Sequence, residues 1–576
     1  MKNQLSYQII RIIALSCILL LLFASCNKND NGTTPVDNKI VIDSVCVNDI
    51  NLPYNKTINN ISIFTNPQLK IVLAQDINPD YFTKETVQLT GGLNFDYHFI
   101  DNRTIQCDIT TTLKALTSYK INIPEGTNDK GGNVVNGYTG TFRAAIDSTD
   151  KYPRISDEEL LTKVQHAAFN FFWEFNPFAV SGLAHEGTGH SPEIATIGGS
   201  GFGIAAIPVA VERGFITRAQ GLERMQKIIG FLSAGTTDRF HGAFPHWING
   251  ETGKVIPFSA KDDGADLVET AFLMEGLIIA RQYFSLNNPE ETTLRDAITS
   301  LFNEVEWDWF RQNEQNVLYW HWSPNYSWDM NMKIQGWNEC LIVYILAAGS
   351  PGHSIDLPVY TEGWAKNGSV KNGKNFYDIT LPLGESYGGP LFFAHYSFIG
   401  LNAQGLSDQY ADYWEQNRNH TLINRQYCIV NPKNFVGYSA DCWGLTAGNI
   451  PAGYNASSPT NDVGTITPTA ALSSMPYTPE ESMQALHFFY YKLGDKIWNG
   501  DKYGFYDGFD LNKNWVSPDV LAIDQLPIVC MIENYRTGLL WNLFMSAPEV
   551  QAGLQKLSFS YPPLEGAGGG CNKNIF

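Results

Sequence analysis

The stretch KDDGADLVETAFLMEGLIIA, residues 261–280, places carboxylates at the head of an apolar segment. After its first residues the stretch has the composition of a buried helix. At helical spacing Asp262, Asp266 and Glu269 follow one another at i, i+4 and i+7, so we expect them to share one face. Acids at a helix start are favoured by its dipole, and a charged stripe usually faces solvent. From Ala271 to Ala280 the residues are apolar except for Glu275, however, so we predict that this charged face borders a cavity.

Other helical segments flank this stretch along the chain. A capping box of Ser156 and Glu159 opens the first, and seven more follow between residues 202 and 546. Some are amphipathic, whereas others are apolar nearly all round and must be covered on most sides. An inner ring of buried helices inside an outer ring of amphipathic ones satisfies both kinds, which predicts an α/α toroid. The long loops between them, rich in Gly, Trp and Tyr, are expected to carry function.

In residues 40–146, apolar residues recur at every second position instead. Ile105, Cys107 and Ile109 alternate with polar residues, and turn clusters separate several such runs. This pattern predicts a small all-β sandwich, which serves as a spacer or a docking module because it holds no catalytic cluster. Cys46 and Cys107 could bridge two of its strands, which the sequence leaves open.

The N-terminus has the layout of a secretory signal. Lys2 and Arg11 precede an apolar run, residues 12–23, that is short for a membrane span. The run ends in FASC and resembles a bacterial lipobox, so we expect a signal peptide over 1–25 and a lipid anchor on Cys26. The alternative is an uncut apolar anchor.

We therefore expect an exported lipoprotein of the outer membrane, on its periplasmic face or at the cell surface, with the lipid as its membrane contact. The further predicted boundaries follow the changes in composition. They are a flexible tether over 26–39, a linker over 147–155, a helical catalytic domain over 156–560 and a tail over 561–576.

The composition of the chain limits the classes of ligand that it can bind. The chain of 576 residues has 39 Lys+Arg against 58 Asp+Glu and a formal charge of -19, so nucleic acid or a polyuronate would be repelled. Its aromatic content of 13%, including 14 Trp, suits flat sugar rings, although many of these side chains also fill a core. No Cys or His spacing typical of a metal site occurs, and we expect neither metal nor cofactor.

A second acid stands in a setting that suits proton donation. Glu339 follows Trp337 and precedes an unbroken apolar run, which disfavours the ionised carboxylate. A carboxyl group against a Trp in apolar surroundings is the pattern of a general acid in glycoside cleavage. The alternative is an acid that only stabilises a helix start. No Ser nucleophile elbow or phosphate-binding loop is present, which leaves chemistry by paired acids.

Further acids are embedded among glycines and aromatic residues, as a sugar cleft requires. They occur in GYSADCWGL, in AIDQLPIVCMIENYRTGLLW and in GFYDGFDLNKN, the last of which also suits an ordinary turn. From these and neighbouring loops we predict the substrate-binding residues Trp337, Trp443, Asp441, His395, Tyr387, Glu533, Tyr535 and Arg536.

Five motifs in order, FGIAAIPVAVERGFIT, WNECLIVYILAAGSPGHSI, GYSADCWGLTAG, TITPTAALSSMPYTPEESMQAL and IDQLPIVCMIENYRTGLLW, resemble the glucoamylase-like domain of bacterial glycoside hydrolases. The chain is similar to glycoside hydrolase family 144, the endo-β-1,2-glucanases, from about residue 155 to 555. The segment from LTSYKINIPEGTNDKGGN to YTGTF resembles bacterial immunoglobulin-like domains.

The resemblance implies an (α/α)6 toroid and cofactor-free, inverting hydrolysis of neutral linear β-1,2-glucan to short oligosaccharides. It places the cleft acids at Asp262, Asp266, Glu269, Glu339 and Asp524. Many relatives have HQYS where this chain has AHYSF around His395, so the sugar groove is expected to differ there.

An inverting glycosidase uses one acid to protonate the leaving oxygen and one carboxylate to activate water, about 6.5–9.5 Å apart. We predict Glu339 as the donor, Asp262 or Asp266 as the base, and Glu269 and Asp524 as groups that hold substrate or water. The alternatives are a glucoamylase or other glucosidase on the same toroid and a catalytically inactive surface glycan-binding lipoprotein.

Overall fold

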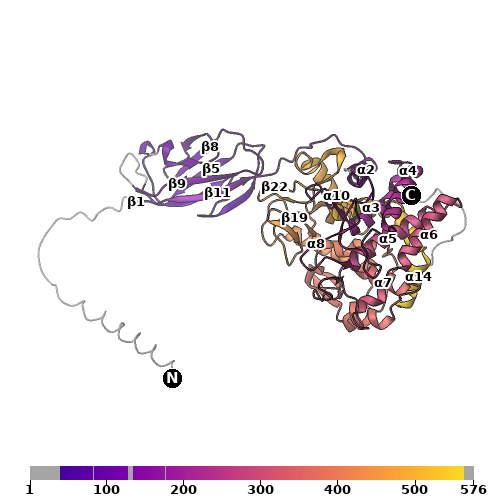
Figure 1. The fold of residues 1–576 in the computed structure, drawn as a ribbon. Coiled ribbons are helices and arrows are strands. Elements are labelled where there is room, and N and C mark those ends of the chain that lie inside the picture. Colours follow the sequence, from indigo (N-terminus) through magenta and orange to yellow (C-terminus); the bar gives the residue numbers. More distant parts are fainter. Residues whose placement is uncertain (1–38, 82, 127–133, 176, 563–576) are drawn as a thin grey trace, which may run out of the picture. The chain divides into compact units, whose positions relative to one another are not determined.

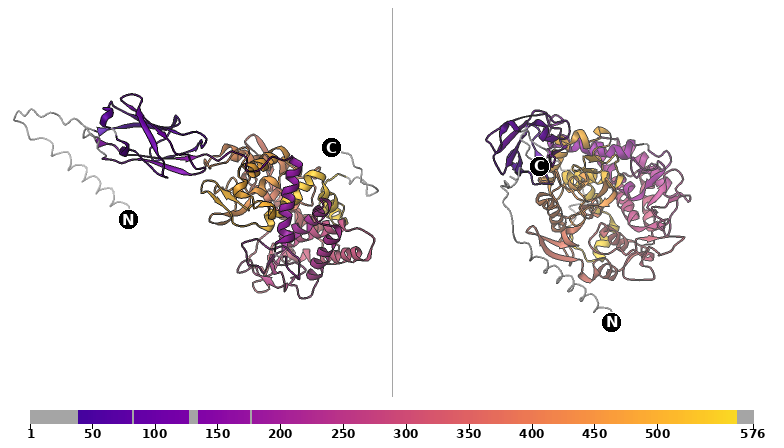
Figure 2. Two further views of the ribbon diagram at one scale, coloured as in Figure 1. Left: turned by 90° about the horizontal axis from the view of Figure 1, so that it is seen from above. Right: turned by 90° about the vertical axis from the view of Figure 1, so that its left-hand side faces the viewer.

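The computed structural model describes residues 39–81, 83–126, 134–175 and 177–562. The chain divides into two compact units, Met1–Ala145 and Ile146–Phe576. Figure 1 and Figure 2 show the elements of each unit from three directions. Within the described ranges, no helix is both long and apolar enough to cross a membrane. The predicted signal peptide and the lipid anchor at Cys26 lie outside the described residues.

The first unit contains two β-sheets that enclose one apolar core. In β8 and β9, buried residues alternate with more exposed ones, because successive side chains of a strand point to opposite faces. Val45, Ile105 and Phe142 lie at the centre of the core with no exposed surface. All pairs within the two main sheets are antiparallel except β4 with β11. This arrangement confirms the predicted all-β domain.

The strands of the first unit form three groups. The first sheet has the order β4 (Thr57–Ile61), β11 (Tyr138–Ala144), β9 (Ser118–Ile123), β6 (Gln88–Leu89). The second has the order β3 (Ile50–Asn51), β2 (Ile42–Val47), β5 (Gln68–Leu73), β8 (Thr104–Ile109), β7 (Phe95–Phe99). The remaining pair is β1 (Lys39–Ile40) and β10 (Val134–Val135).

The two cysteines in the described part of this unit, Cys46 and Cys107, are free thiols. Cys46 on β2 is paired with Lys70 on β5, which in turn is paired with Gln106 on β8, next to Cys107. Two strand spacings of about 4.8 Å each therefore separate the two backbones. A disulfide needs Cα atoms within about 7 Å, so the sheet order rules out the bridge that the sequence left open.

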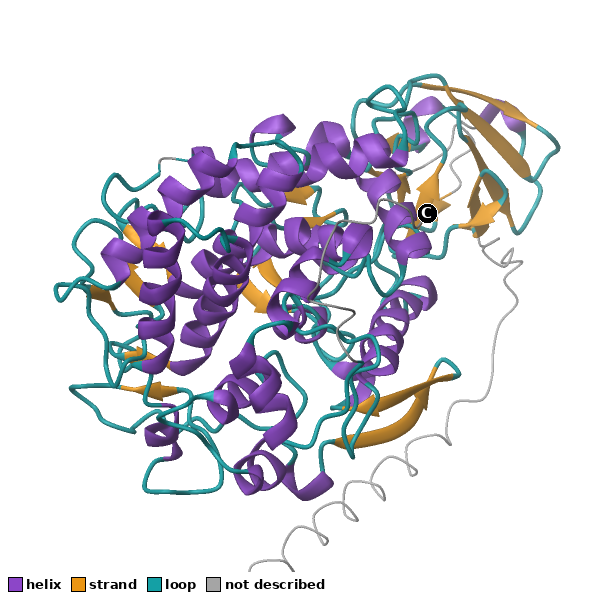
Figure 3. Ribbon diagram, turned by 90° about the vertical axis from the view of Figure 1, so that its right-hand side faces the viewer, coloured by secondary structure: helices purple, strands orange, loops and turns teal. Residues whose placement is uncertain are grey.

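The second unit is mainly helical, as Figure 3 shows in purple. Its α-helices are α2 (Asp157–Glu174), α3 (Ile197–Glu212), α4 (Arg218–Leu232), α5 (Leu267–Tyr283), α6 (Pro289–Asn303), α7 (Leu341–Gly349), α8 (Tyr413–Val430), α9 (Pro468–Leu472), α10 (Pro479–His487), α11 (Gly494–Ile497), α12 (Ala522–Thr537), α13 (Leu539–Met545) and α14 (Pro548–Lys556).

Short strand pairs and single helical turns connect these helices. The strands are β12 (Ile194–Thr196), β13 (Trp247–Asn249), β14 (Val255–Ile256), β15 (Ala265–Asp266), β16 (His321–Trp322), β17 (Lys371–Phe376), β18 (Ile379–Leu383), β19 (Ala447–Ile450), β20 (Gly453–Ala456), β21 (Phe509–Asp510) and β22 (Trp515–Val516). The turns used below are η7 (Leu391–Ala394), η8 (Tyr396–Phe398) and the π-helical η9 (Phe488–Lys492).

The helices differ in burial in the way that their composition predicts. Helix α7 is buried along its whole length, and α3, α5 and α12 are buried over most of theirs. By contrast, α4, α6 and α14 bury one face only. Helices that are apolar all round need other helices on most sides, so the buried set forms the interior of the unit.

Two glycines allow the interior helices α3 and α5 to touch. A Cβ atom on Gly201 would collide with the backbone oxygen of Phe272, and one on Gly276 would collide with the backbone of Gly201. The two backbones are thus in direct contact. This contact positions the first turn of α5, with its acids, beside the first turn of α3.

The predicted linker 147–155 lies against the second unit. The amide of Lys151 donates to the carbonyl of Tyr491, 2.7 Å away, and the ring of Tyr152 packs on Tyr490. Lys492 Nζ also reaches Asp150 at 2.7 Å. These contacts attach the segment to η9 before α2 begins.

Candidate active site

The second unit contains a cavity of about 430 Å³. The N-cap residue of α3, the first turns of α5 and α12 and the segment ahead of α7 contribute to its wall. Its acids and histidines are Glu186, Glu269, Glu339, His190 and His246. Its aromatic residues are Trp247, Phe258, Phe272, Trp320, Phe392, Tyr396 and Tyr454. This composition, flat rings with several carboxyl groups, suits a polyhydroxylated ring compound.

The start of α5 differs from the sequence prediction. The helix begins at Leu267, and Asp266 is its N-cap: Oδ1 of Asp266 accepts the amides of Val268 at 3.0 Å and Glu269 at 2.9 Å. Asp262 lies in the preceding loop, not on the helix. The expected i, i+4, i+7 face is therefore wrong, because β15 pairs with β16 and holds residues 265–266 extended. The acids still come together, through the loop.

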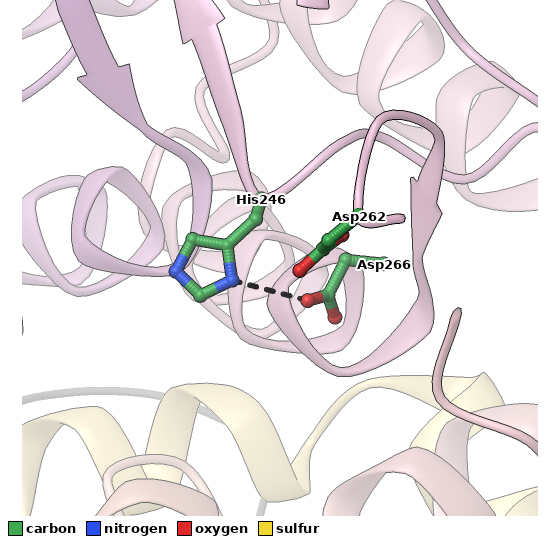
Figure 4. Close-up of side chains that lie close together, drawn as sticks. All are labelled: His246, Asp262 and Asp266. Carbon is green, nitrogen blue, oxygen red and sulfur yellow. Dashed lines mark hydrogen bonds and ion pairs between the residues drawn. The ribbon is translucent and has the colours of Figure 1, made fainter. Parts of the chain in front are cut away.

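A histidine joins these aspartates. Nδ1 of His246 lies 3.2 Å from Oδ2 of Asp266, and Asp262 points at the same place (Figure 4). Nε2 of His321 is 3.6 Å from one oxygen of each aspartate. Burial opposes the charged form of His246, but the carboxylates of Glu269 and Asp266 outweigh it and raise its pKa to about 10. An imidazolium therefore stands among the carboxylates.

The same three residues offer ligand atoms to a cation, since one atom each of His246, Asp262 and Asp266 lies within 4.8 Å of the others. A nitrogen and two oxygens suit a divalent ion in kind. However, both oxygens of Asp266 already take part in hydrogen bonds, with the helix amides and with His246. The imidazolium supplies the positive charge, so the cluster needs no ion for charge balance.

Two glutamates of the predicted catalytic set line the cavity directly. Burial raises the pKa of Glu339 to about 7, and the charge of Asp266 adds to the effect. Burial also raises the pKa of Glu269 to about 7, opposed by His246. Oε2 of Glu269 accepts the amide of Gly198 at 2.7 Å, in the first turn of α3. Both acids can therefore hold a proton near neutral pH.

The pKa values of Asp262 and Asp266 are shifted in opposite directions. Burial, with the charge of Asp266, raises the pKa of Asp262 to about 7. The pKa of Asp266 is lowered, because the hydrogen bond from His246 and the charges of the histidines outweigh burial. Oδ1 of Asp262 has no hydrogen-bond partner among the described residues. Asp266 is thus the ionised member, and its oxygens are occupied.

Asp524 lies in the first turn of α12, directly after two residues that line the cavity, Leu521 and Ile523. Its own side chain is buried. Its Oδ1 accepts the hydroxyl of Tyr396 at 3.4 Å, and Tyr396 lines the cavity. Burial and the charge of Asp507 hold the pKa of Asp524 well above its usual range. Of the five predicted catalytic acids, two line the cavity and three stand directly behind its wall.

Three of the predicted substrate-binding residues lie elsewhere on α12. Glu533 is buried and forms a fork with Arg213, 2.8 Å from its Nε. Arg536 donates to Gln165 at 2.6 Å and pairs with Glu158, and Tyr535 is exposed. Nine residues of helix, about 13 Å, separate Glu533 from Asp524. Glu533 and Arg536 join α12 to α3 and α2, and none of the three residues lines the cavity.

The other predicted binding residues are also placed away from the cavity wall. Trp443, Trp337 and His395 are buried in the core, and His395 Nε2 is 2.9 Å from Ser474 Oγ. Tyr387 packs on Phe376 beside the β17–β18 hairpin, and Asp441 is exposed. Apolar and aromatic neighbours in the sequence are typical of core residues as well as of residues in a binding groove. Here the side chains of Trp443, Trp337 and His395 belong to the core.

Sequence reasoning missed several residues of the wall. Glu186 accepts the indole N–H of Trp247 at 2.9 Å, and Phe258 stacks on His246 with ring centroids 4.1 Å apart. Tyr454, on the β19–β20 hairpin, is 57% exposed and forms part of the rim. Glu186 and Tyr454 follow the rule applied elsewhere, an acid or aromatic residue in a glycine-containing loop, which could have identified them.

Comparison with known proteins shows the family. The Glycoamylase family model matches residues 331–548. The endo-β-1,2-glucanase of Chitinophaga pinensis, solved with sophorotriose and glucose, is 54% identical with a TM-score of 0.69, over 71% of this chain and 100% of that one. The β-1,2-glucanase of Parabacteroides distasonis is 38% identical with a TM-score of 0.68, over 90% of this chain and 73% of that one.

A curated relative from Parabacteroides distasonis, an exo β-1,2-glucooligosaccharide sophorohydrolase acting at the non-reducing end, is 46% identical over 431 residues. The match covers 71% of this chain and 59% of that relative's length. The solved relatives, in contrast, are covered over their whole length or most of it. The chain therefore belongs to the bacterial β-1,2-glucanases with a glucoamylase-like domain, glycoside hydrolase family 144, and is a glycoside hydrolase.

Proposed function

We propose that this enzyme hydrolyses β-1,2-glucan, with Glu339 as the proton donor. The observation that carries this proposal is the position of Glu339: it lines the cavity, and burial raises its pKa to about 7. A donor works best when its pKa is close to the working pH. The substrate follows from the relatives, which are named for action on β-1,2-linked glucans or glucooligosaccharides.

The reaction proceeds with inversion. The proton of Glu339 passes to the glycosidic oxygen as the C1–O bond breaks, and a carboxylate takes a proton from the water whose oxygen bonds to C1. We assign this second role to Glu269, which lines the same cavity. Asp262 and Asp266 are not among the residues that line the cavity, so the base predicted from sequence is revised.

Endo cleavage to short oligosaccharides is supported by the Chitinophaga pinensis relative, which carries the name endo-β-1,2-glucanase. Exo release of disaccharides is the second candidate, because the Parabacteroides distasonis sophorohydrolase is 46% identical. Digestion of long β-1,2-glucan separates them. A ladder of products early in the reaction supports the endo mode, and disaccharide as the sole early product supports the exo mode.

Two further assignments belong to this proposal. An (α/α)6 toroid is supported by the interior set α3, α5, α7 and α12 beside the one-faced helices. Export as an outer-membrane lipoprotein is supported by the apolar run that ends at Cys26. Labelling of cells with a radioactive fatty acid, with Cys26→Ser as the comparison, tests the anchor.

The substitution Glu339→Gln tests the proposed function. We expect kcat on β-1,2-glucan to fall at least about 1,000-fold, while binding of the glucan to the variant changes little. Glu362→Gln, at an exposed position of the same unit, is the control and keeps full activity. Proton NMR of the first anomer formed reports inversion. Retained turnover in Glu339→Gln would overturn the role of Glu339.

A further inference from the structure

A second buried acid stands beside Asp524. Asp507, in the loop ahead of β21, is 4% exposed, and Asp524 is 3% exposed. The two carboxyl groups are hydrogen-bonded to each other. Oδ1 of Asp507 and Oδ2 of Asp524 have no N–H or hydroxyl partner among the described residues. Two carboxylates in contact cannot both stay ionised, so one proton lies between them.

The backbone determines which of the pair keeps the charge. Oδ2 of Asp507 accepts the amide of Asn449 at 2.5 Å, a bond that favours the ionised carboxylate. Asp524 instead accepts only the long bond from the Tyr396 hydroxyl. The proton therefore resides on Asp524, which agrees with the larger upward shift of the pKa of Asp524.

This pair leads to the cavity from two sides. Asn449, on β19, lines the cavity and is held by Asp507, and Tyr396, on η8, lines it and is held by Asp524. The charged or titratable groups that interact with the pair are Asp519, Glu186, Tyr396 and Tyr454. These groups are carboxyls and phenols, so the proton shared by Asp507 and Asp524 is what relieves the repulsion between the two carboxylates.

We propose that Asp507 is a positioning residue: it shares one proton with Asp524 and thereby sets the direction of the hydrogen bonds from Asp507 through Asp524 to Tyr396. With the proton on Asp524, the Tyr396 hydroxyl donates to Oδ1 of Asp524. The phenolic oxygen then presents lone pairs to the cavity, where they accept from a sugar hydroxyl. The carboxylate of Asp507 also holds Asn449, which lies at the opposite end of the pair from Tyr396.

This inference rests on the proposed function, because it assigns Asp507 a part in holding the substrate of that reaction. It predicts a pH effect in one direction. Burial, against the bond from Asp524, raises the pKa of Asp507 to about 6. Below that pH both carboxyls are protonated and the bond to the Asn449 amide weakens, so kcat/KM falls on the acid side.

The test uses Asp507→Asn in the full chain. The amide can still accept from Asn449 and can donate to Asp524, but it cannot titrate. We expect a roughly tenfold loss of kcat/KM at pH 7 and an acid limb that no longer steepens below about pH 6, because Glu269 still titrates in the variant and residue 507 does not. Asp510→Asn is the matched control, because Asp510 is buried three residues further on, on β21, and its side chain accepts only from Asn512 and Lys513 among the described residues.

The double variant Asp507→Asn with Asp524→Asn completes a cycle. If the two residues act as one unit, the loss in the double variant is well short of the product of the single losses. Thermal unfolding of each variant separates misfolding from the effect on kcat/KM. An acid limb that still steepens below about pH 6 in Asp507→Asn, or losses that multiply, would overturn the pairing. If Glu339→Gln is inactive at the same time, the proposed function stands and this inference alone fails.

Discussion

Nδ1 of His246 lies 3.2 Å from Oδ2 of Asp266, and this contact joins the residue ahead of β13 to the N-cap of α5. The imidazolium lowers the pKa of both Glu269 and Asp262 against the burial that raises it. One side chain thus controls how much carboxylate the cavity holds at neutral pH.

His246→Gln should therefore move the acid limb of kcat/KM toward higher pH. Without the positive charge the pKa of Glu269 rises further, so the proposed base is ionised only at higher pH, and we expect a shift of about one unit with a lower kcat at pH 7. His241→Gln is the matched control, because His241 pairs with Glu306 at 2.8 Å outside the cavity wall. An acid limb that does not move in His246→Gln contradicts the electrostatic role.

The alkaline side of the profile reports Glu339. A donor is active only when protonated, and the pKa of Glu339 is about 7. Activity should therefore fall as pH rises through about 7, with log kcat/KM losing one unit per pH unit above it. The measurement is kcat/KM on β-1,2-glucan across the pH range in buffers of equal ionic strength. A profile flat to about pH 9 would show that Glu339 is not the titrating donor.

Phe258 should contribute to binding and not to chemistry. Its ring is 49% exposed, lines the cavity and stacks on His246. Phe258→Ala removes a flat face for a sugar ring, and we expect KM to rise about five-fold with kcat nearly unchanged. Phe64→Ala, at an exposed site of the first unit, serves as the control. A fall in kcat alone would place Phe258 in the chemical step instead.

Glu275 should make stability depend on pH. It is fully buried in α5, Oε1 accepts the amide of Gly400 at 2.7 Å, and burial holds its pKa well above the usual value. A raised pKa in the folded state means that the folded state keeps a proton that the unfolded chain releases, so stability falls as pH rises above the unfolded value of about 4.5.

Glu275→Gln keeps the acceptor for Gly400 and removes the titration. We expect the variant to be more stable than the wild type at pH 8 and similar to it at pH 5, measured as Tm. Glu290→Gln, at an exposed position of α6, should leave the difference between the two pH values unchanged. Equal Tm differences at pH 5 and pH 8 for Glu275→Gln would contradict the burial argument.

Glu533 should act on stability and not on the substrate. Removing it leaves Arg213, which is 21% exposed, without its carboxylate, and breaking such a pair costs about 3 kcal/mol. Glu533→Ala should lower the free energy of unfolding by that amount with KM unchanged. Glu158→Ala breaks the pair with Arg536 from its exposed side, since the Glu158 side chain is 70% exposed, and should cost less than about 1 kcal/mol. A raised KM in Glu533→Ala would restore the binding role predicted from sequence.

Local pattern predicted the elements well. The capping box at Ser156 and Glu159 starts α2, and the alternation around Ile105 lies on β8. The local pattern failed at the N-terminus of α5, where Asp262 and Asp266 precede the helix. There, pairing of residues 265–266 with residues 321–322 as strands competes with helix formation. A contact between segments 55 residues apart leaves no trace in local periodicity.

Two of the acids that line the cavity, Glu269 and Glu339, were predicted from sequence, whereas Glu186 and the partners of these acids were not. Glu339 and Glu269 stood out as carboxyls at the start of apolar runs, since burial of an acid is visible in its neighbours along the chain. His246, Glu186 and Asp507 come from loops whose composition suits a turn equally well, and only their neighbours in space show their part.

The sequence by itself determined the division into a β unit and a helical unit, the buried character of α5 and α7, and the residues able to carry the proton. Tertiary structure decided which acids share one cavity, which are neutralised by His246, and that Glu533 and Arg536 join helices away from the cavity wall. The reason is that hydrophobic periodicity acts over a few residues, whereas the ionisation of a carboxyl depends on every charge within several ångströms, wherever that charge lies along the chain.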